Sequence, residues 1–149
     1  MDPQINLELE TRIDAPRARV WDALTRDTAV WFGREADGGP GNGFTLEAHV
    51  GGRFFRHLRE SHGEGMGHLW GHVQVIKPPH LLEISGPLAC SMPALNHVAF
   101  RLSEDGDATL VSFKHVGLGM FPEDFLGGFE RGWRSLLEEG LKKHVEQHN

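Results

Sequence analysis

The chain has 149 residues, of which 39% are hydrophobic and 24% charged, a composition typical of soluble globular proteins. This length suits one domain over residues 1–149. The net charge is −6 and the lysines and arginines are scattered, which argues against the concentrated basic face that nucleic acid requires. No apolar run approaches the roughly 18 residues of a membrane span. The acidic, strand-like residues 1–10 do not resemble a signal peptide, and the single cysteine, Cys90, predicts a reducing, cytoplasmic location without a disulfide framework.

The first elements are a strand and a short helix. Residues 4–13 alternate between apolar and polar side chains, which predicts a half-buried strand. Pro16 suits a first helical turn, so we expect a helix from Pro16 to about Thr25. Trp31 and Phe32 follow, in a second short helical turn or a loop.

A series of strands comes next. Residues 35–43 are rich in glycine and predict a loop, and turn signals then separate six further strands. We expect these strands at residues 44–50, 53–60, 66–76, 81–85, 94–102 and 108–116. Sequential strands joined by tight turns predict an antiparallel sheet, and helices kept apart from the strands predict an α+β fold.

The last hairpin allows a register to be predicted. A four-residue loop at residues 104–107 would pair Ser103 with Ala108 and gather the apolar side chains on one face. This register places Asn96 opposite His115, at the end of the apolar stripe. Two interpretations remain open: the pair hydrogen-bonds to each other or to backbone, or it orients the polar end of a ligand.

The C-terminal residues 122–147 predict one long helix with large apolar side chains. Four glycines interrupt this helix: Gly127, Gly128, Gly132 and Gly140. Each glycine lowers helix stability by about 1 kcal/mol relative to alanine. Such glycines indicate either close packing or open space, so we expect a sheet that grips this helix around a pocket.

The sequence predicts no catalytic residue, no metal site and no cofactor. His68 and His72 are four residues apart, but on a strand this spacing covers roughly 13 Å, too far for one ion. The chain lacks a GxSxG and a CxxC motif, and the residues next to Cys90 in the sequence match no catalytic signature. An enzyme that uses His115 or a cavity carboxylate as acid and base remains an alternative.

Several motifs together resemble the activator of heat-shock-protein-90 ATPase homologue-like family. They are, in chain order, Ile13-Asp14-Ala15-Pro16 with Val20-Trp21-Asp22-Ala23-Leu24-Thr25, Val50-Gly51-Gly52-Arg53-Phe54, Gly71-His72-Val73 with Pro78-Pro79-His80-Leu81, Phe113-Lys114-His115-Val116-Gly117-Leu118, and Gly132-Trp133 with Leu136, Leu137 and Leu141. The family is part of the START-like, birch-pollen-allergen-like (SRPBCC) superfamily. The resemblance implies the helix-grip fold: a curved antiparallel sheet of about seven strands around a long C-terminal helix, with short helices between strands 1 and 2. The chain departs from the family pattern at the glycine-rich residues 37–43 and at Glu47-Ala48-His49.

The resemblance also implies a function, because relatives bind lipids, sterols or other apolar molecules in a cavity between sheet and helix. We therefore expect a binding domain for a small apolar molecule, lipid-like or aromatic, in a monomer or homodimer. Trp31 and Phe32 would close one mouth of the cavity. The alternatives are a chaperone-related or stress-response module with a protein partner, and a cyclase- or hydrolase-like enzyme. The expected ligand-binding residues are Trp31, Phe32, Val73, Val75, Leu82, Ile84, Asn96, Val98, Phe100, Val111, Phe113, His115, Phe125, Phe129 and Trp133.

Overall fold

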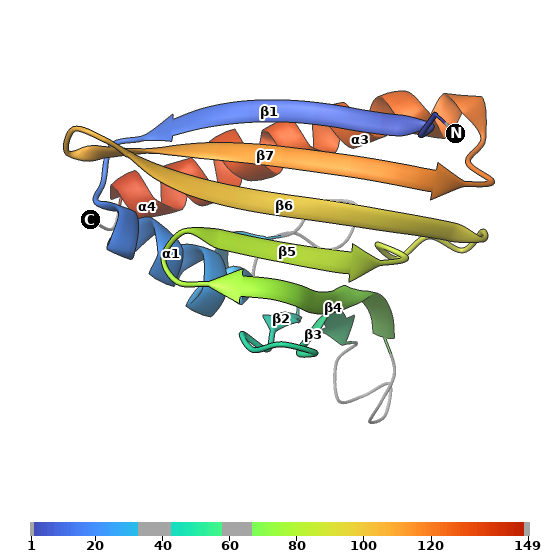
Figure 1. Ribbon diagram of the computed structural model, residues 1–149, viewed down its shortest axis with the longest axis horizontal. Coiled ribbons are helices and arrows are strands. Elements are labelled where there is room, and N and C mark those ends of the chain that lie inside the picture. The colour runs from blue at the N-terminus through green and yellow to red at the C-terminus, as the bar shows by residue number, and fades with distance from the viewer. Residues whose placement is uncertain (1, 33–42, 58–66, 148–149) are drawn as a thin grey trace.

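The computed structural model describes residues 2–32, 43–57 and 67–147, and its core is one seven-stranded antiparallel sheet (Figure 1). The strand order is β1-β7-β6-β5-β4-β3-β2, which confirms the predicted helix-grip sheet. The predicted loop residues 35–42 and 61–65 lie outside the described residues. The strands are β1 (Ile5–Ile13), β2 (Phe44–Leu46), β3 (Arg53–His57), β4 (Gly67–Lys77), β5 (Leu81–Gly86), β6 (Ala94–Asp105) and β7 (Ala108–Gly119).

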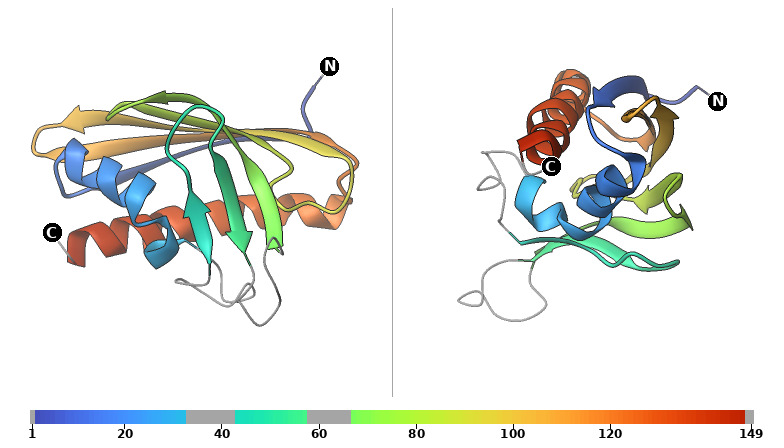
Figure 2. Two further views of the ribbon diagram at one scale, coloured as in Figure 1. Left: turned by 90° about the horizontal axis from the view of Figure 1, so that it is seen from below. Right: turned by 90° about the vertical axis from the view of Figure 1, so that its left-hand side faces the viewer.

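All the helices cover the same face of the sheet, which curves around them (Figure 2). Between β1 and β2 lie α1 (Arg17–Arg26) and the short α2 (Thr28–Trp31), as predicted. The C-terminal helix begins after Pro122 and consists of α3 (Glu123–Ser135), the π-helical segment η3 (Leu136–Lys142) and α4 (Lys143–Gln147). The alternation of β1 is also confirmed, because Ile5, Leu9, Thr11 and Ile13 are buried.

The β6–β7 hairpin has a shorter turn than predicted. Asp105 pairs with Ala108, so only Gly106 and Asp107 form the loop, and Gly106 has a φ of 63°. A glycine with positive φ at the first loop position is typical of a two-residue type II′ turn. The register therefore shifts by two residues from the prediction. Because side chains alternate with a period of two, this shift leaves every residue on its predicted face.

Two irregularities in β4 change which side chains face the helices. Val73 pairs with Ile84 but Val75 pairs with Glu83, so the intervening residue forms a bulge. The bulge places Val75 on the outer face with Glu83, which corrects the prediction that Val75 faces the interior. A second irregularity, where Phe54 and Phe55 of β3 pair with Gly71 and Leu69, leaves Trp70 as the extra residue.

Strand β2 is shorter than the predicted residues 44–50, because residues 47–52 form a tight turn. The Glu47 carboxylate accepts three hydrogen bonds from Arg53: one from its backbone N–H and two from its guanidinium, at 2.8–2.9 Å. These bonds lower the pKa of Glu47 to about 2. The turn thus holds the carboxylate in its charged form and fixes where β2 ends and β3 begins.

The two halves of the C-terminal helix pack differently on the sheet. In η3 and α4, the side chains of Leu136, Leu137, Leu141 and Val145 are buried. Gly140 allows a close approach to α2, since an added Cβ would lie 2.9 Å from the carbonyl oxygen of Trp31. In α3, by contrast, Trp133 is the only fully buried residue. The first turns of α3 therefore stand away from the core, which leaves space between helix and sheet.

Candidate ligand-binding site

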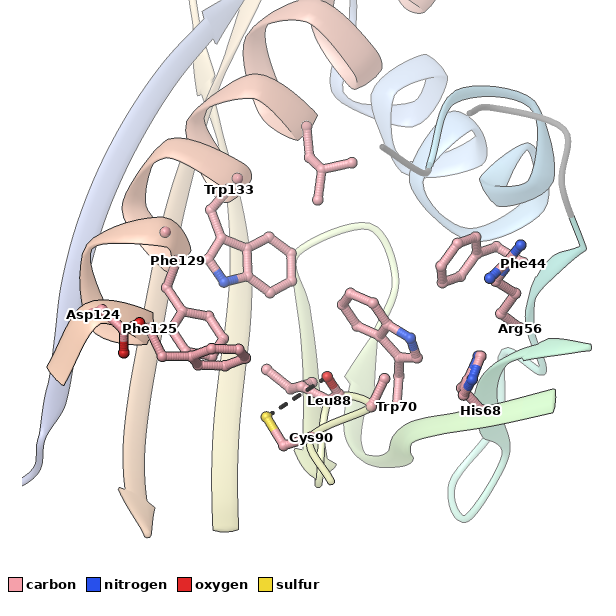
Figure 3. Close-up of a pocket in the computed structure, with 14 residues that line it drawn as sticks. Phe44, Arg56, His68, Trp70, Leu88, Cys90, Asp124, Phe125, Phe129 and Trp133 are labelled. Atoms are coloured by element: carbon pink, nitrogen blue, oxygen red, sulfur yellow. Dashed lines mark hydrogen bonds between the residues drawn. The ribbon is translucent and has the colours of Figure 1, made fainter. Parts of the chain in front are cut away.

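A cavity of about 340 Å³ lies beneath the first three turns of α3, between this helix, strands β2 to β4 and the loop after β5 (Figure 3). Ligand pockets for small molecules have volumes of roughly 300–1,000 Å³ and are mostly apolar, so this cavity is at the lower end of that range. It is lined by Phe44, Arg56, His68, Trp70, Leu88, Ala89, Cys90, Asp124, Phe125, Gly128, Phe129, Gly132, Trp133 and Leu136.

The helix side of the cavity combines aromatic rings with glycines. Phe125 and Phe129 pack edge to face with centroids 5.3 Å apart, and Phe125 is 43% exposed. A Cβ added at Gly128 would meet no heavy atom within 4 Å, so this glycine faces open space. Exposed Asp124 and Phe125 place an opening of the cavity at the start of α3.

The loop side of the cavity has an unusual backbone conformation. Leu88 and Ala89 have φ values of 50° and 61°, a region that non-glycine residues rarely occupy and that costs free energy. Their N–H groups donate to the carbonyl oxygens of Trp70 and Leu69, which compensates for the strain and holds the loop against β4. Burial raises the pKa of the neighbouring Cys90 thiol, so a thiolate nucleophile is disfavoured there.

The sheet side of the cavity is formed by aromatic and basic residues. Trp70 lies 5.4 Å from Phe44 and 6.4 Å from Trp133, between ring centroids, so it joins the sheet wall to the helix wall. Arg56 pairs with Phe44 in β2 and with His68 in β4. The two basic side chains therefore lie next to each other at one end of an aromatic wall (Figure 3).

A buried hydrogen-bond chain connects the helix to the loop behind the cavity. The indole N–H of Trp133 donates to Nδ1 of His115 at 3.0 Å, and His115 Nε2 lies 2.8 Å from Oδ1 of Asn96. Asn96 in turn donates from Nδ2 to the carbonyl oxygen of Pro87 at 3.3 Å. Gly117, opposite Asn96, leaves room for this side chain, because an added Cβ would lie 2.6 Å from Oδ1. The chain thus links two walls of the cavity.

This chain of hydrogen bonds also determines which nitrogen of His115 carries the proton. An indole can only donate, so Nδ1 must be unprotonated and the proton of the neutral ring sits on Nε2, facing Asn96. Removal from water lowers the pKa of His115 from 6.5 to about 4. His115 is therefore neutral at pH 7, and all its polar atoms have protein partners.

The structure separates twelve of the fifteen expected ligand-binding residues into three groups. Phe125, Phe129 and Trp133 line the cavity. Asn96 and His115 are fully buried and bond to each other, as the first of the two interpretations expected. The remaining inward residues belong to the closely packed core and do not line the cavity: Val73, Leu82, Ile84, Val98, Phe100, Val111 and Phe113.

Trp31 and Phe32 lie elsewhere than expected. They are 3% and 2% exposed, and the Phe32 ring contacts Phe44, Phe54 and Trp70. These two residues therefore form part of the core behind the sheet wall, and the prediction that they close a mouth of the cavity is corrected.

Several lining residues were not expected from the sequence. Arg56 and His68 are polar residues on the inner face of their strands. They interrupt the apolar pattern of that face, and this interruption is visible in the sequence. Leu88 and Ala89 line the cavity only because of their positive φ values, for which the sequence offers no signal such as glycine.

A second polar cluster lies on the outer face of the sheet. His97 contacts Oγ of Ser85 through Nδ1 and Oε1 of Glu83 through Nε2, both at 2.7 Å. Glu83 and Ser85 alternate with the buried Leu82 and Ile84 along β5, so this cluster points away from the helices and the cavity.

Two further findings concern metals and membranes. Within residues 2–32, 43–57 and 67–147, no three His, Cys, Asp or Glu side chains are grouped closely enough to hold a metal ion. In the same part of the chain, no helix has the length and apolar character needed to cross a membrane.

Solved structures with this fold include proteins from several bacteria. CalU16 from Micromonospora echinospora is 27% identical, with a TM-score of 0.65 over 94% of this chain and 73% of that chain. NE0264 from Nitrosomonas europaea is 17% identical, with a TM-score of 0.70 over 99% and 98% of the two chains. The Aha1 dimer from Colwellia psychrerythraea is 19% identical, with a TM-score of 0.66 over 96% and 97%.

A family model covers most of the chain. No match was found among curated proteins. The model of the Activator of Hsp90 ATPase homolog 1-like protein family, whose fold commonly binds small hydrophobic ligands, matches residues 14–146. This match includes strands β2 to β7, nearly all of the helical residues and the cavity described above, and begins directly after β1. The chain therefore belongs to the family of Activator of Hsp90 ATPase homolog 1-like proteins.

Proposed function

We propose that this protein binds a small hydrophobic or amphipathic molecule in the cavity beneath α3. The observation that carries the proposal is the cavity itself, about 340 Å³ in volume and walled by Phe44, Trp70, Phe129 and Trp133. Burial of an apolar ligand there would remove aromatic surface from water, which contributes about 25 cal/mol for each Å².

The alternative of a protein-interaction module agrees less well with the interior. Such a module has no use for an open interior, whereas here a cavity separates the start of α3 from the sheet. An enzyme that uses His115 is also disfavoured, because its two ring nitrogens bond to Trp133 and Asn96 and the ring does not line the cavity.

The proposal predicts that filling the cavity from Gly128 weakens binding. A phenylalanine at Gly128 would start from open space and occupy the cavity, so we expect Gly128→Phe to weaken binding of the apolar dye N-phenylnaphthylamine at least about tenfold, or 1.4 kcal/mol. The measurement is a fluorescence titration. Native mass spectrometry of freshly purified wild type and Gly128→Phe would reveal in parallel whether a co-purified molecule is lost.

The matched control is the adjacent glycine. Gly127 is exposed and does not line the cavity, so Gly127→Phe makes the same chemical change outside the site. We expect this variant to bind the dye like the wild type. The proposal is wrong if the wild type does not bind the dye, or if the two variants bind it equally well.

A further inference from the structure

The inner face of the sheet carries a few polar side chains among its apolar ones, and in the described strands Arg56 and His68 are the polar residues that line the cavity. The side chains that β2 and β3 direct inward are Phe44, Leu46, Phe54 and Arg56, and the irregularity at Trp70 adds His68 from β4. A charged side chain in an inward position loses hydration, so such positions usually carry apolar residues. Polar residues at inward positions that are otherwise apolar are expected at functional sites.

The charges at the two ends of the cavity differ in their contact with water. Asp124, on the helix side, is exposed, so water screens its charge. Arg56 is half-buried beside the buried ring of Phe44, where its charge acts on a bound molecule more strongly. Arg56 therefore brings a positive charge to the cavity in a less hydrated position than the negative charge of Asp124.

Arginine is also suited in shape to bind an acid. Its planar guanidinium stays charged at all relevant pH values and presents N–H groups in a fork that matches a carboxylate or a similar oxyanion. His68, paired directly with Arg56 across the two strands, offers a further ring N–H. The aromatic wall formed by Phe44, Trp70 and Trp133 begins next to this pair.

We infer that the ligand is an amphipathic organic anion, with an apolar body among the aromatic rings and one acidic group, such as a carboxylate or sulfonate, bound by Arg56 and His68. This inference rests on the proposed function and specifies the class of ligand. The acidic group enters at the end of the cavity formed by β3 and β4, and the apolar body extends toward Phe129 and Trp133 beneath α3.

Two dyes with the same aromatic framework test the inference. Anilinonaphthalene sulfonate carries one anionic group that N-phenylnaphthylamine lacks. We expect the wild type to bind the sulfonate more tightly than the neutral dye. Arg56→Gln should weaken binding of the sulfonate about tenfold, as expected for the loss of a charge-assisted hydrogen bond, and leave binding of the neutral dye unchanged.

The control removes the same charge from the opposite face of the same strand. Arg53 is exposed and bonds to Glu47, so Arg53→Gln should leave the affinity for both dyes unchanged. The inference is overturned if the neutral dye binds as tightly as the sulfonate, or if the two arginine variants lose the same affinity for the sulfonate, while the proposed function would stand. If neither dye binds to the wild type, the proposed function fails and the anion site fails with it.

Discussion

Replacement of Trp133 with alanine is expected to lower the free energy of unfolding by about 3–5 kcal/mol, the range observed when a large buried aromatic side chain is removed. The Trp133 ring is 4% exposed and lies 4.5 Å from Phe113 and 6.3 Å from both Phe100 and Phe32, between centroids. The substitution also leaves Nδ1 of buried His115 without a donor. The loss of packing and the loss of the hydrogen bond add to each other in this variant.

Trp133→Phe separates the two contributions. A phenylalanine keeps a ring against Phe113 but cannot donate to His115, so we expect a smaller loss of about 1–3 kcal/mol, the cost of a buried acceptor without a partner. Urea denaturation followed by circular dichroism measures both variants without relying on tryptophan fluorescence. Equal losses for the two variants would contradict the role of the Trp133 ring in joining the helix to the sheet.

The protein is expected to lose stability as the pH falls from about 6.5 to 4, through protonation of His115 in the unfolded chain. The pKa of His115 is 6.5 in the unfolded chain and about 4 in the folded protein, so below pH 6.5 the unfolded chain binds a proton that the folded protein does not. The stabilisation from neutral His115 is complete above pH 6.5 and is lost progressively down to pH 4, a total of about 3 kcal/mol.

A variant without the titrating ring isolates this contribution. His115→Gln is expected to be less stable at pH 7, because the bond from Trp133 is disturbed, but to lose less stability than the wild type between pH 6.5 and 4. Glu47 acts in a lower window, since its pKa of about 2 lies below its ordinary value of 4.5 and its contribution is lost only as the pH falls below 4.5. Identical pH profiles of the two proteins above pH 4.5 would show that His115 does not titrate in this way.

The fold followed from local patterns in the sequence because those patterns are set by periodicity. Alternation with a period of two identified the inward face of β1, β6 and β7, and it remained correct after the register of the last hairpin shifted by two residues. Alternation alone does not fix this register; its signal is Gly106-Asp107, in which glycine occupies the first position of a two-residue type II′ turn. Glycines in the last helix indicate either close contact or open space. Gly140 lies in close contact with Trp31, and Gly128 faces open space.

The cavity was harder to predict, because its lining depends on interruptions of those same patterns. An extra residue in β4 directs Trp70 inward and places His68 beside Arg56, and a second one places Val75 on the outer face. Single bulges have no reliable signature in one sequence, since they are fixed by the pairing of both strands. Arg56 was detectable in principle, as a charge in an otherwise apolar inward row, but only after the strand's register was known.

The most direct test of ligand binding in this cavity uses the indole N–H signals of the four tryptophans in a two-dimensional ¹⁵N NMR spectrum. Trp70 and Trp133 line the cavity, whereas Trp21 in α1 is buried away from it. On addition of N-phenylnaphthylamine, we expect the Trp70 and Trp133 signals to shift and saturate together while the Trp21 signal keeps its position. A spectrum in which the Trp70 and Trp133 signals do not move at a saturating concentration of the dye would contradict ligand binding in this cavity.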